Sequence, residues 1–117
     1  MLNDEYRYRI LKLLEEKPDA SQREIARVLG VSLGRVNFCL QALVEMGLLK
    51  VNNFKANPNK RKYLYFLTPM GMEEKSQVTV RFLKRKLDEY EAIKAEIEEL
   101  RRDASALKIP VEEGQAR

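Results

Sequence analysis

Histidine is absent from this chain of 117 residues, and cysteine occurs only once, as Cys39. Without histidine, the ordinary zinc sites and every Ser-His or Cys-His nucleophile arrangement are excluded. A single cysteine also excludes an internal disulfide framework and is typical of a reducing compartment. We therefore expect no metal site, no cofactor and no enzymatic activity.

Glycine is scarce and long apolar runs are missing. The five glycines, at positions 30, 34, 47, 71 and 114, are scattered and form no phosphate-binding loop. No run of 18 or more apolar residues is present, and the N-terminal stretch MLNDEYRYRI lacks the apolar segment of a signal peptide. We therefore expect a cytoplasmic protein with one modest core and no membrane partner.

Two short helices joined by a tight turn are predicted over residues 21 to 47. Ser21 and Glu24, three residues apart, form a capping-box pattern, and Gly30 ends the first helix. Ser32 is placed to cap the second helix, which Gly47 ends. Such a pair can present its second helix to the major groove of DNA.

The second of these helices has an apolar face and an opposite, more polar face. Its apolar positions recur at steps of three and four residues, as Val36, Leu40, Leu43 and Val44. The predicted DNA-binding residues of this recognition helix are Ser32, Gly34, Arg35, Asn37, Phe38 and Gln41. Arginine, asparagine and glutamine are side chains that read base edges, and we expect Arg35 and Asn37 to carry the readout.

Three other features of the two-helix segment leave alternatives open. Phe38 could meet a thymine methyl group, but we favour packing against the following hairpin. The start of the first helix is a predicted phosphate contact, with solvation as the alternative, and comprises Ser21, Gln22 and Arg23. Cys39 lies near the core edge, so we favour a buried, inert thiol over a redox switch.

A basic hairpin is predicted after the two helices. The stretch KVNNFKANPNKRKYLYFLT alternates apolar and polar residues around a turn rich in asparagine, proline and lysine. Its predicted DNA-binding residues are Lys55, Asn57, Lys60, Arg61 and Lys62. Lysines can also blunt a sheet edge. The position directly after a recognition-type helix favours phosphate or minor-groove contact.

A further helix is predicted over residues 4 to 17, before the two-helix segment, with Pro18 just past its end. The order helix, helix, helix, strand, strand is that of a winged helix-turn-helix. The expected fold class is therefore mainly α with a small β-hairpin, followed by a long C-terminal helix. The expected segments are residues 1–68 for DNA binding, 69–108 for a coiled-coil-like helix and 109–117 for a disordered tail.

The long helix begins at Thr68, a capping residue followed by proline. Its apolar positions step mostly by three and four residues, as in a coiled coil. About 35 helical residues extend roughly 50 Å, beyond a core some 25 to 30 Å across, so we favour a homodimer over a different partner chain. The predicted dimerisation residues are Phe82, Leu83, Leu87, Tyr90, Ile93, Ile97, Leu100 and Leu107.

The run VSLGRVNFCLQALVEMGLL resembles the recognition segment of MarR-type winged-helix regulators. Residues at the family's framework positions are Val31, Ser32, Val36, Leu40, Leu43, Gly47 and Leu48. Three further stretches, MLNDEYRYRILKLLEE, NNFKANPNKRKYLYFLTPMGMEEK and RFLKRKLDEYEAIKAEIEELRR, resemble the exopolysaccharide-associated members. The resemblance covers roughly residues 1–105 and implies a bacterial transcriptional regulator encoded near exopolysaccharide biosynthesis genes.

We therefore expect a homodimeric, sequence-specific regulator that binds double-stranded DNA at an inverted repeat and is associated with the nucleoid. Two alternatives remain at this stage. The long helix could make the protein an interaction adaptor, or exposed tyrosines of the hairpin could stack on RNA bases. The sequence does not indicate a small-molecule effector.

Overall fold

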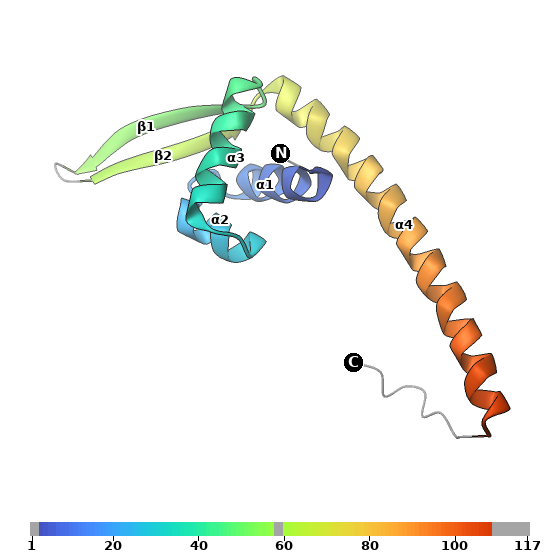
Figure 1. Ribbon diagram of the computed structural model, residues 1–117. Helices are drawn as coiled ribbons and strands as arrows, with labels where there is room; N and C mark the ends of the chain where they lie inside the picture. The colour runs from blue at the N-terminus through green and yellow to red at the C-terminus, as the bar shows by residue number, and fades with distance from the viewer. Residues whose placement is uncertain (1–2, 58–59, 109–117) are drawn as a thin grey trace. The chain divides into compact units, whose positions relative to one another are not determined.

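The computed structural model describes residues 3–57 and 60–108, with the side chains of residues 54–57, 60 and 61 left out. The elements are α1 (Asp4–Glu16), α2 (Gln22–Leu29), α3 (Leu33–Glu45), β1 (Leu49–Asn57), β2 (Lys60–Leu67) and α4 (Pro69–Ala106) (Figure 1). The expected class, mainly α with one β-hairpin and a long last helix, is confirmed. The expected disordered tail, residues 109–117, lies outside the described residues.

The chain divides into two compact units, one up to Phe82 and the other from Leu83 onward. The division falls within α4, whereas the sequence suggested a boundary where this helix begins. The first unit therefore contains the three short helices, the hairpin and the first turns of α4.

Local capping signals set the starts of the short helices. Asn3 caps α1, because its Oδ1 accepts a hydrogen bond from the backbone N–H of Tyr6 at 2.8 Å. Ser21 and Glu24 form the expected capping box of α2. Ser32 Oγ accepts from the backbone N–H of Arg35 at 3.1 Å and caps α3. These contacts satisfy backbone N–H groups that a helix start leaves unpaired.

Gly30 ends α2 in the left-handed conformation, with φ of 70°. Its backbone N–H donates to the carbonyl oxygen of Ala26 at 2.8 Å. This conformation favours glycine because a Cβ atom makes it costly, and it turns the chain from α2 into the cap of α3.

The core of the first unit lies where the three short helices meet the hairpin. Its fully buried aliphatic side chains come from all three helices: Ile10, Leu11, Leu14, Ile25, Val36, Leu40 and Leu43. Val78 of α4 is also fully buried. Because one side of α3 packs on this core, its opposite side is exposed to solvent.

The hairpin pairs β1 and β2 in antiparallel register, with Val51 opposite Tyr65 and Asn53 opposite Tyr63. The ladder is irregular between Lys55 and Asn57. Tyr65 is buried, whereas the side chain of Tyr63, nearer the tip, is 48% exposed. The backbone N–H of Tyr65 donates to the carbonyl oxygen of Pro18 at 3.0 Å, which ties β2 to the turn after α1.

Ion pairs join the start of α4 to α1 within the first unit. Arg7 contacts Glu74 at 2.5 Å, and Lys75 pairs with Glu15. Phe82, which was expected in the dimer interface, lies against Tyr8 of α1 with ring centroids 5.5 Å apart. The first turns of α4 are therefore part of the packing of the first unit.

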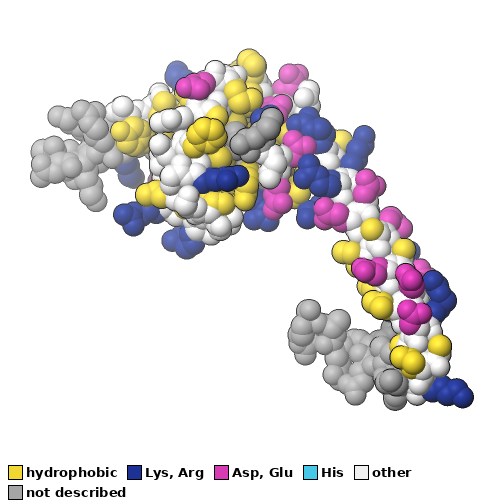
Figure 2. Space-filling view, viewed as in Figure 1, with side chains coloured by type: hydrophobic (Ala, Val, Ile, Leu, Met, Phe, Trp, Pro, Cys, Tyr) yellow, Lys and Arg dark blue, Asp and Glu magenta, His cyan; other side chains and the backbone are white. Residues whose placement is uncertain are grey.

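The second unit begins with the remainder of α4, where apolar side chains are exposed along a highly charged helix (Figure 2). Residues 88 to 103 contain seven acidic and three basic residues. The large exposed apolar residues among the described ones from Leu83 onward are Leu83, Leu87, Tyr90, Ile93, Ile97, Leu100 and Leu107. Their exposed fractions range from 44% to 69%, so this single chain leaves the whole stripe uncovered.

Within the described part of the chain, no helix taken singly has the length and apolar composition needed to cross a membrane. The bent pair α2 and α3, with 106° between them, passes that test only when the two are taken together.

Candidate nucleic-acid interface

The outward stripe of α3 is the surface that this fold presents to a ligand. Each helical residue advances by about 100°, so residues 34, 38, 41 and 45 lie on the side opposite the buried Val36 and Leu43. All four residues of this stripe are exposed, and they are Gly34, Phe38, Gln41 and Glu45. Glu45 was not among the predicted contacts, although its spacing of seven residues from Phe38 indicates the same stripe.

Arg35 and Asn37, the expected readers, are exposed on the two flanks of this stripe. The guanidinium carbon of Arg35 lies 5.5 Å from the centroid of the Tyr6 ring of α1. On the other flank, Nε2 of Gln22 donates a hydrogen bond to Oδ1 of Asn37 at 3.4 Å. Each of the two side chains thus contacts a neighbouring helix.

The expectation that Phe38 packs against the hairpin is wrong, because its side chain is 59% exposed. Two residues beyond the fully buried Val36, Phe38 is rotated by about 200° and points away from the core. An aromatic ring is thereby placed in the middle of the polar recognition face, with its surface open to an apolar group of a ligand.

Gly34 lies at the start of this stripe, in the first turn of α3. A Cβ atom built on Gly34 would meet nothing within 4 Å. Packing inside the protein therefore does not require glycine at this position, and a small residue leaves room for close approach by another molecule.

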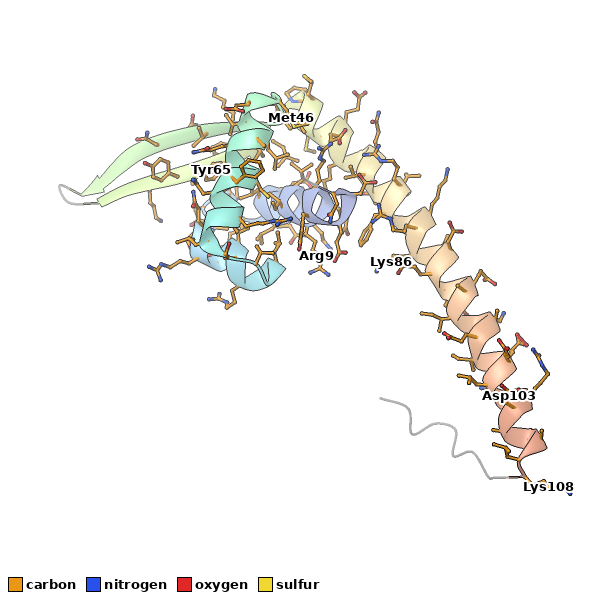
Figure 3. All side chains as sticks on the ribbon, viewed as in Figure 1. Arg9, Met46, Tyr65, Lys86, Asp103 and Lys108 are labelled. Carbon is orange, nitrogen blue, oxygen red and sulfur yellow. The ribbon has the colours of Figure 1, made fainter. Side chains whose placement is uncertain are left out.

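An open groove of about 440 Å³ lies between α3 and the hairpin. Its walls include the amide side chains of Gln22, Asn37 and Gln41, and Val51, Tyr63 and Tyr65 of the strands. The side chain of Tyr65 is seen beside α3 in Figure 3. The groove thus combines hydrogen-bonding amides with aromatic rings and continues the recognition face toward the hairpin.

The start of α2 carries the three expected phosphate contacts. Ser21 and Arg23 are exposed, and Gln22 is half-buried. The hydroxyl oxygen of Ser21 accepts from the backbone N–H of Glu24 at 3.0 Å, so capping occupies it as an acceptor. Arg23 remains the cationic side chain at this end of the interface.

Glu24 brings a negative charge to the same end of α2. Lys17 Nζ donates to Glu24 at 2.6 Å, and this bond, followed by the one from the Ser21 backbone, lowers the pKa of the Glu24 carboxyl. The same hydrogen bond raises the pKa of Lys17. The pair is therefore fully ionised at neutral pH, where it supports the capping box.

The hairpin holds the remaining expected contacts. Lys62 is exposed and lies 3.9 Å from a carboxylate oxygen of Asp19. In the strand register Lys55 is opposite Arg61, and Asn57 is opposite Lys60, at the end of the ladder away from the core. The side chains of these last four residues lie outside the described ones.

The described residues offer few side chains for binding a metal ion or for thiol reactions. Across residues 3–57 and 60–108, no three side chains of the ligating types come together in a way that could hold a metal ion. Cys39 is 4% exposed, as expected from its spacing, and burial raises the pKa of its thiol despite the nearby charge of Arg35. A buried thiol with a raised pKa forms little reactive thiolate at neutral pH.

Comparison with known proteins finds a DNA-binding family model that matches the N-terminal part of the chain. Residues 3–50 match the family model described as winged helix-turn-helix DNA-binding. No curated protein matches the chain.

Solved structures match most of the chain. Lactococcus lactis ZitR, in complex with DNA, is 25% identical over 92% of this chain and 74% of its own, with a TM-score of 0.57. A transcriptional regulator homologue from Pyrococcus horikoshii is 25% identical over 72% and 81% of the two chains, with a TM-score of 0.53. A MarR/EmrR family regulator from Acinetobacter is 23% identical over 86% and 75%, with a TM-score of 0.55.

The Pyrococcus and Acinetobacter proteins are described as transcriptional regulators. The Acinetobacter protein is described as a MarR/EmrR family member, and AdcR, another matching structure, as a zinc-dependent MarR-family regulator. The expected resemblance to MarR-type regulators is thereby confirmed, over both the winged-helix unit and the long helix that follows it. The chain is a winged helix-turn-helix protein with the fold of the MarR-family transcriptional regulators.

Proposed function

We propose that this protein is a transcriptional regulator that binds an inverted repeat in double-stranded DNA as a homodimer. The observation that carries the proposal is the exposed stripe of α3, where an open glycine, an aromatic ring and two polar side chains are flanked by Arg35 and Asn37. Helix-turn-helix proteins place such a stripe in the major groove. The DNA complex of the similar ZitR supports this use of the fold.

The interface divides into residues that read bases and residues that contact the backbone. Arg35, Asn37 and Gln41 are of the types that recognise base edges, and Phe38 suits a thymine methyl group. Arg23 at the start of α2 and the basic residues of the hairpin, Lys55, Lys60, Arg61 and Lys62, are the proposed phosphate contacts, with Asn57 beside them.

The proposed dimer uses the apolar stripe of the second unit. Six large apolar side chains of α4, from Leu83 to Leu100, are exposed in the single chain, and their steps of three and four residues suit a helical partner. A second copy supplies a matching stripe by symmetry, as in most soluble oligomers. Two copies would set their α3 helices in successive major grooves about 34 Å apart, so the operator should be an inverted repeat.

The salt dependence of binding tests the DNA interface. If each protomer neutralises about five phosphates, the logarithm of the association constant should fall with the logarithm of salt concentration at a slope near −9 for the dimer. Fluorescence anisotropy on duplex DNA between about 50 and 200 mM salt measures this slope. A nearly flat slope would contradict the proposal and favour a protein-interaction adaptor.

Two substitutions separate reading from backbone contact. Arg35→Ala should relax the base preference at one position of each half-site, whereas Lys60→Ala should weaken binding evenly on all sequences. Equal losses for both variants on every sequence would contradict this division. Tighter binding to single-stranded RNA than to duplex DNA would instead indicate an RNA-binding winged helix.

Sedimentation equilibrium tests the dimer. Ile97→Glu places a charge on the apolar stripe, and we expect this variant to sediment as a monomer and to bind the inverted repeat more weakly. Ala95→Glu is the matched control, because residue 95 is exposed but lies about 200° around the helix from residue 97. A dimer that survives Ile97→Glu would show that the interface lies elsewhere.

The proposed target genes rest on the sequence resemblance, which suggests genes of exopolysaccharide biosynthesis. A DNA-binding regulator of such genes would act in the cytoplasm, in association with the nucleoid. Mapping the bound operator onto the host genome tests this part, since the resemblance predicts half-sites upstream of such genes.

A further inference from the structure

We propose that Tyr6 is a positioning residue for DNA recognition, which holds the guanidinium of Arg35 at the flank of the recognition face. This inference rests on the proposed function. Tyr6 belongs to α1, which lies outside the two-helix segment formed by α2 and α3. The contact between the Tyr6 ring and the Arg35 side chain is therefore a tertiary contact between α1 and α3.

The geometry is that of a cation–π contact. The guanidinium carbon of Arg35 lies 5.5 Å from the centroid of the Tyr6 ring, within the distance of about 6 Å at which the ring face attracts a cation. A guanidinium in contact with a ring face keeps its N–H donors pointing outward from its edges. A carboxylate partner would occupy those donors, whereas an aromatic ring leaves them for a base edge or a phosphate.

Tyr6 is itself held in place by the first turns of α1. Its backbone N–H donates to the capping oxygen of Asn3 at 2.8 Å. The next residue, Arg7, pairs with Glu74 at 2.5 Å. Asp4, two residues before Tyr6, accepts hydrogen bonds from Nε and Nη2 of Arg81 at 3.1 and 3.2 Å. These bonds anchor the turn that carries the ring to the first turns of α4.

Holding Arg35 before DNA arrives has a thermodynamic consequence. A long arginine side chain loses rotamer freedom when it binds, and preorganisation lowers that loss. An exposed cation–π contact of about 0.5–1 kcal/mol corresponds to roughly a two- to fivefold change in affinity. We therefore expect removal of the ring to weaken operator binding by that factor and to relax the same base position as Arg35→Ala.

The test compares Tyr6→Leu, which removes the ring, with Tyr6→Phe, which retains it. Each variant is titrated against the operator selected by the wild-type protein and against operators changed at the base that Arg35→Ala relaxes. We expect Tyr6→Phe to behave as wild type and Tyr6→Leu to lose affinity and preference at that base. In an Arg35→Ala background, Tyr6→Leu should have no further effect on binding.

Three results would overturn the inference. Wild-type binding by Tyr6→Leu would mean that the contact has no role, and tighter binding would mean that the ring keeps Arg35 away from DNA. Equal losses with and without Arg35 would indicate a merely structural role. Thermal unfolding checks that each variant is folded, and Tyr6→Met provides a second variant without a ring. Failure of the proposed function is distinct, because the wild-type protein would then select no operator.

Discussion

A Cβ atom on Gly71 would lie 2.0 Å from the carbonyl oxygen of Leu48. The same oxygen accepts a hydrogen bond from the backbone N–H of Thr68 at 3.1 Å, and Thr68 Oγ1 donates to the carbonyl oxygen of Gly47 at 2.5 Å. The first turn of α4 is thus packed directly on the backbone that leads into β1. Glycine at position 71 makes this approach possible.

Gly71→Ala should destabilise the winged-helix unit strongly. The added methyl group meets backbone atoms, which cannot rotate away, so the cost should reach at least about 3 kcal/mol, the upper end for overpacking. Chemical denaturation followed by circular dichroism measures the free energy of unfolding. A loss of less than about 0.5 kcal/mol would show that the chain relieves the contact by a small shift.

Gly34→Ala is the matched substitution at an open position. Since a Cβ atom there meets nothing within 4 Å, the free energy of unfolding should stay the same or rise by up to about 1 kcal/mol, because alanine favours a helix. DNA affinity should nevertheless fall, because the methyl group would lie where the duplex approaches. Unchanged affinity in an anisotropy titration would show that α3 does not approach DNA at this residue.

Phe38→Ala should leave stability within about 0.5 kcal/mol of wild type, because the ring is exposed. Its operator affinity should fall by about fourfold, the equivalent of ~0.8 kcal/mol for one buried methyl-sized group.

Replacing thymine by uracil in the operator removes the methyl groups that Phe38 is expected to contact. This replacement should weaken operator binding by the wild-type protein by a similar factor. It should not weaken operator binding by the Phe38→Ala variant any further. Equal effects of the base change on both proteins would contradict the thymine contact.

Acid should remove the stabilisation that Glu24 contributes. Its pKa is lowered in the folded protein by the hydrogen bond from Lys17 and then by the backbone of Ser21, from an ordinary value of 4.5. A carboxyl with a lowered folded pKa stabilises the protein above the unfolded pKa, and this contribution is lost as the pH falls through the folded pKa. The loss should therefore occur below about pH 4.5.

Denaturant midpoints at a series of pH values measure this dependence. Glu24→Gln keeps a side-chain oxygen at the capping position but cannot titrate, so its midpoint should fall less on acidification than that of wild type. Lys17→Met removes the donor and should reduce the pH dependence in the same direction. Parallel curves for all three proteins would contradict a role for this pair.

Cys39 should react slowly with thiol reagents in the native protein, because burial shields the thiol and raises its pKa. The control is Phe38→Cys in a Cys39→Ala background, which places a thiol at the exposed neighbouring position. We expect the control to react at least tenfold faster. Comparable rates, with loss of DNA binding on labelling Cys39, would favour the redox switch instead.

The helix starts could be predicted from the sequence because their signals are local. A serine cap with its partner three residues later acts within one turn, so the roles of Ser21 and Ser32 needed no knowledge of the rest of the fold. The buried face of α3 followed in the same way from its spacing, and the structure confirms Val36, Leu40 and Leu43 in the core.

Contacts between distant segments could not be predicted in this way. Helical spacing left a wide arc of α3 outside the core, but the exposure of Phe38 and the neighbour of Arg35 depend on where α1 and the hairpin lie. Phe82 shared the spacing of the dimer stripe, yet it lies against Tyr8. The requirement for glycine at position 71 arises from a tertiary contact with Leu48, which no local pattern reveals.

The central claim is most directly tested by selecting the purified full-length protein on a library of random duplex DNA at about 150 mM salt, followed by sequencing of the bound molecules. We expect enrichment of an inverted repeat whose half-sites are about one helical turn, 34 Å, apart. Salt-sensitive binding without any enriched sequence, or no binding at all, would contradict a dimeric, sequence-specific regulator.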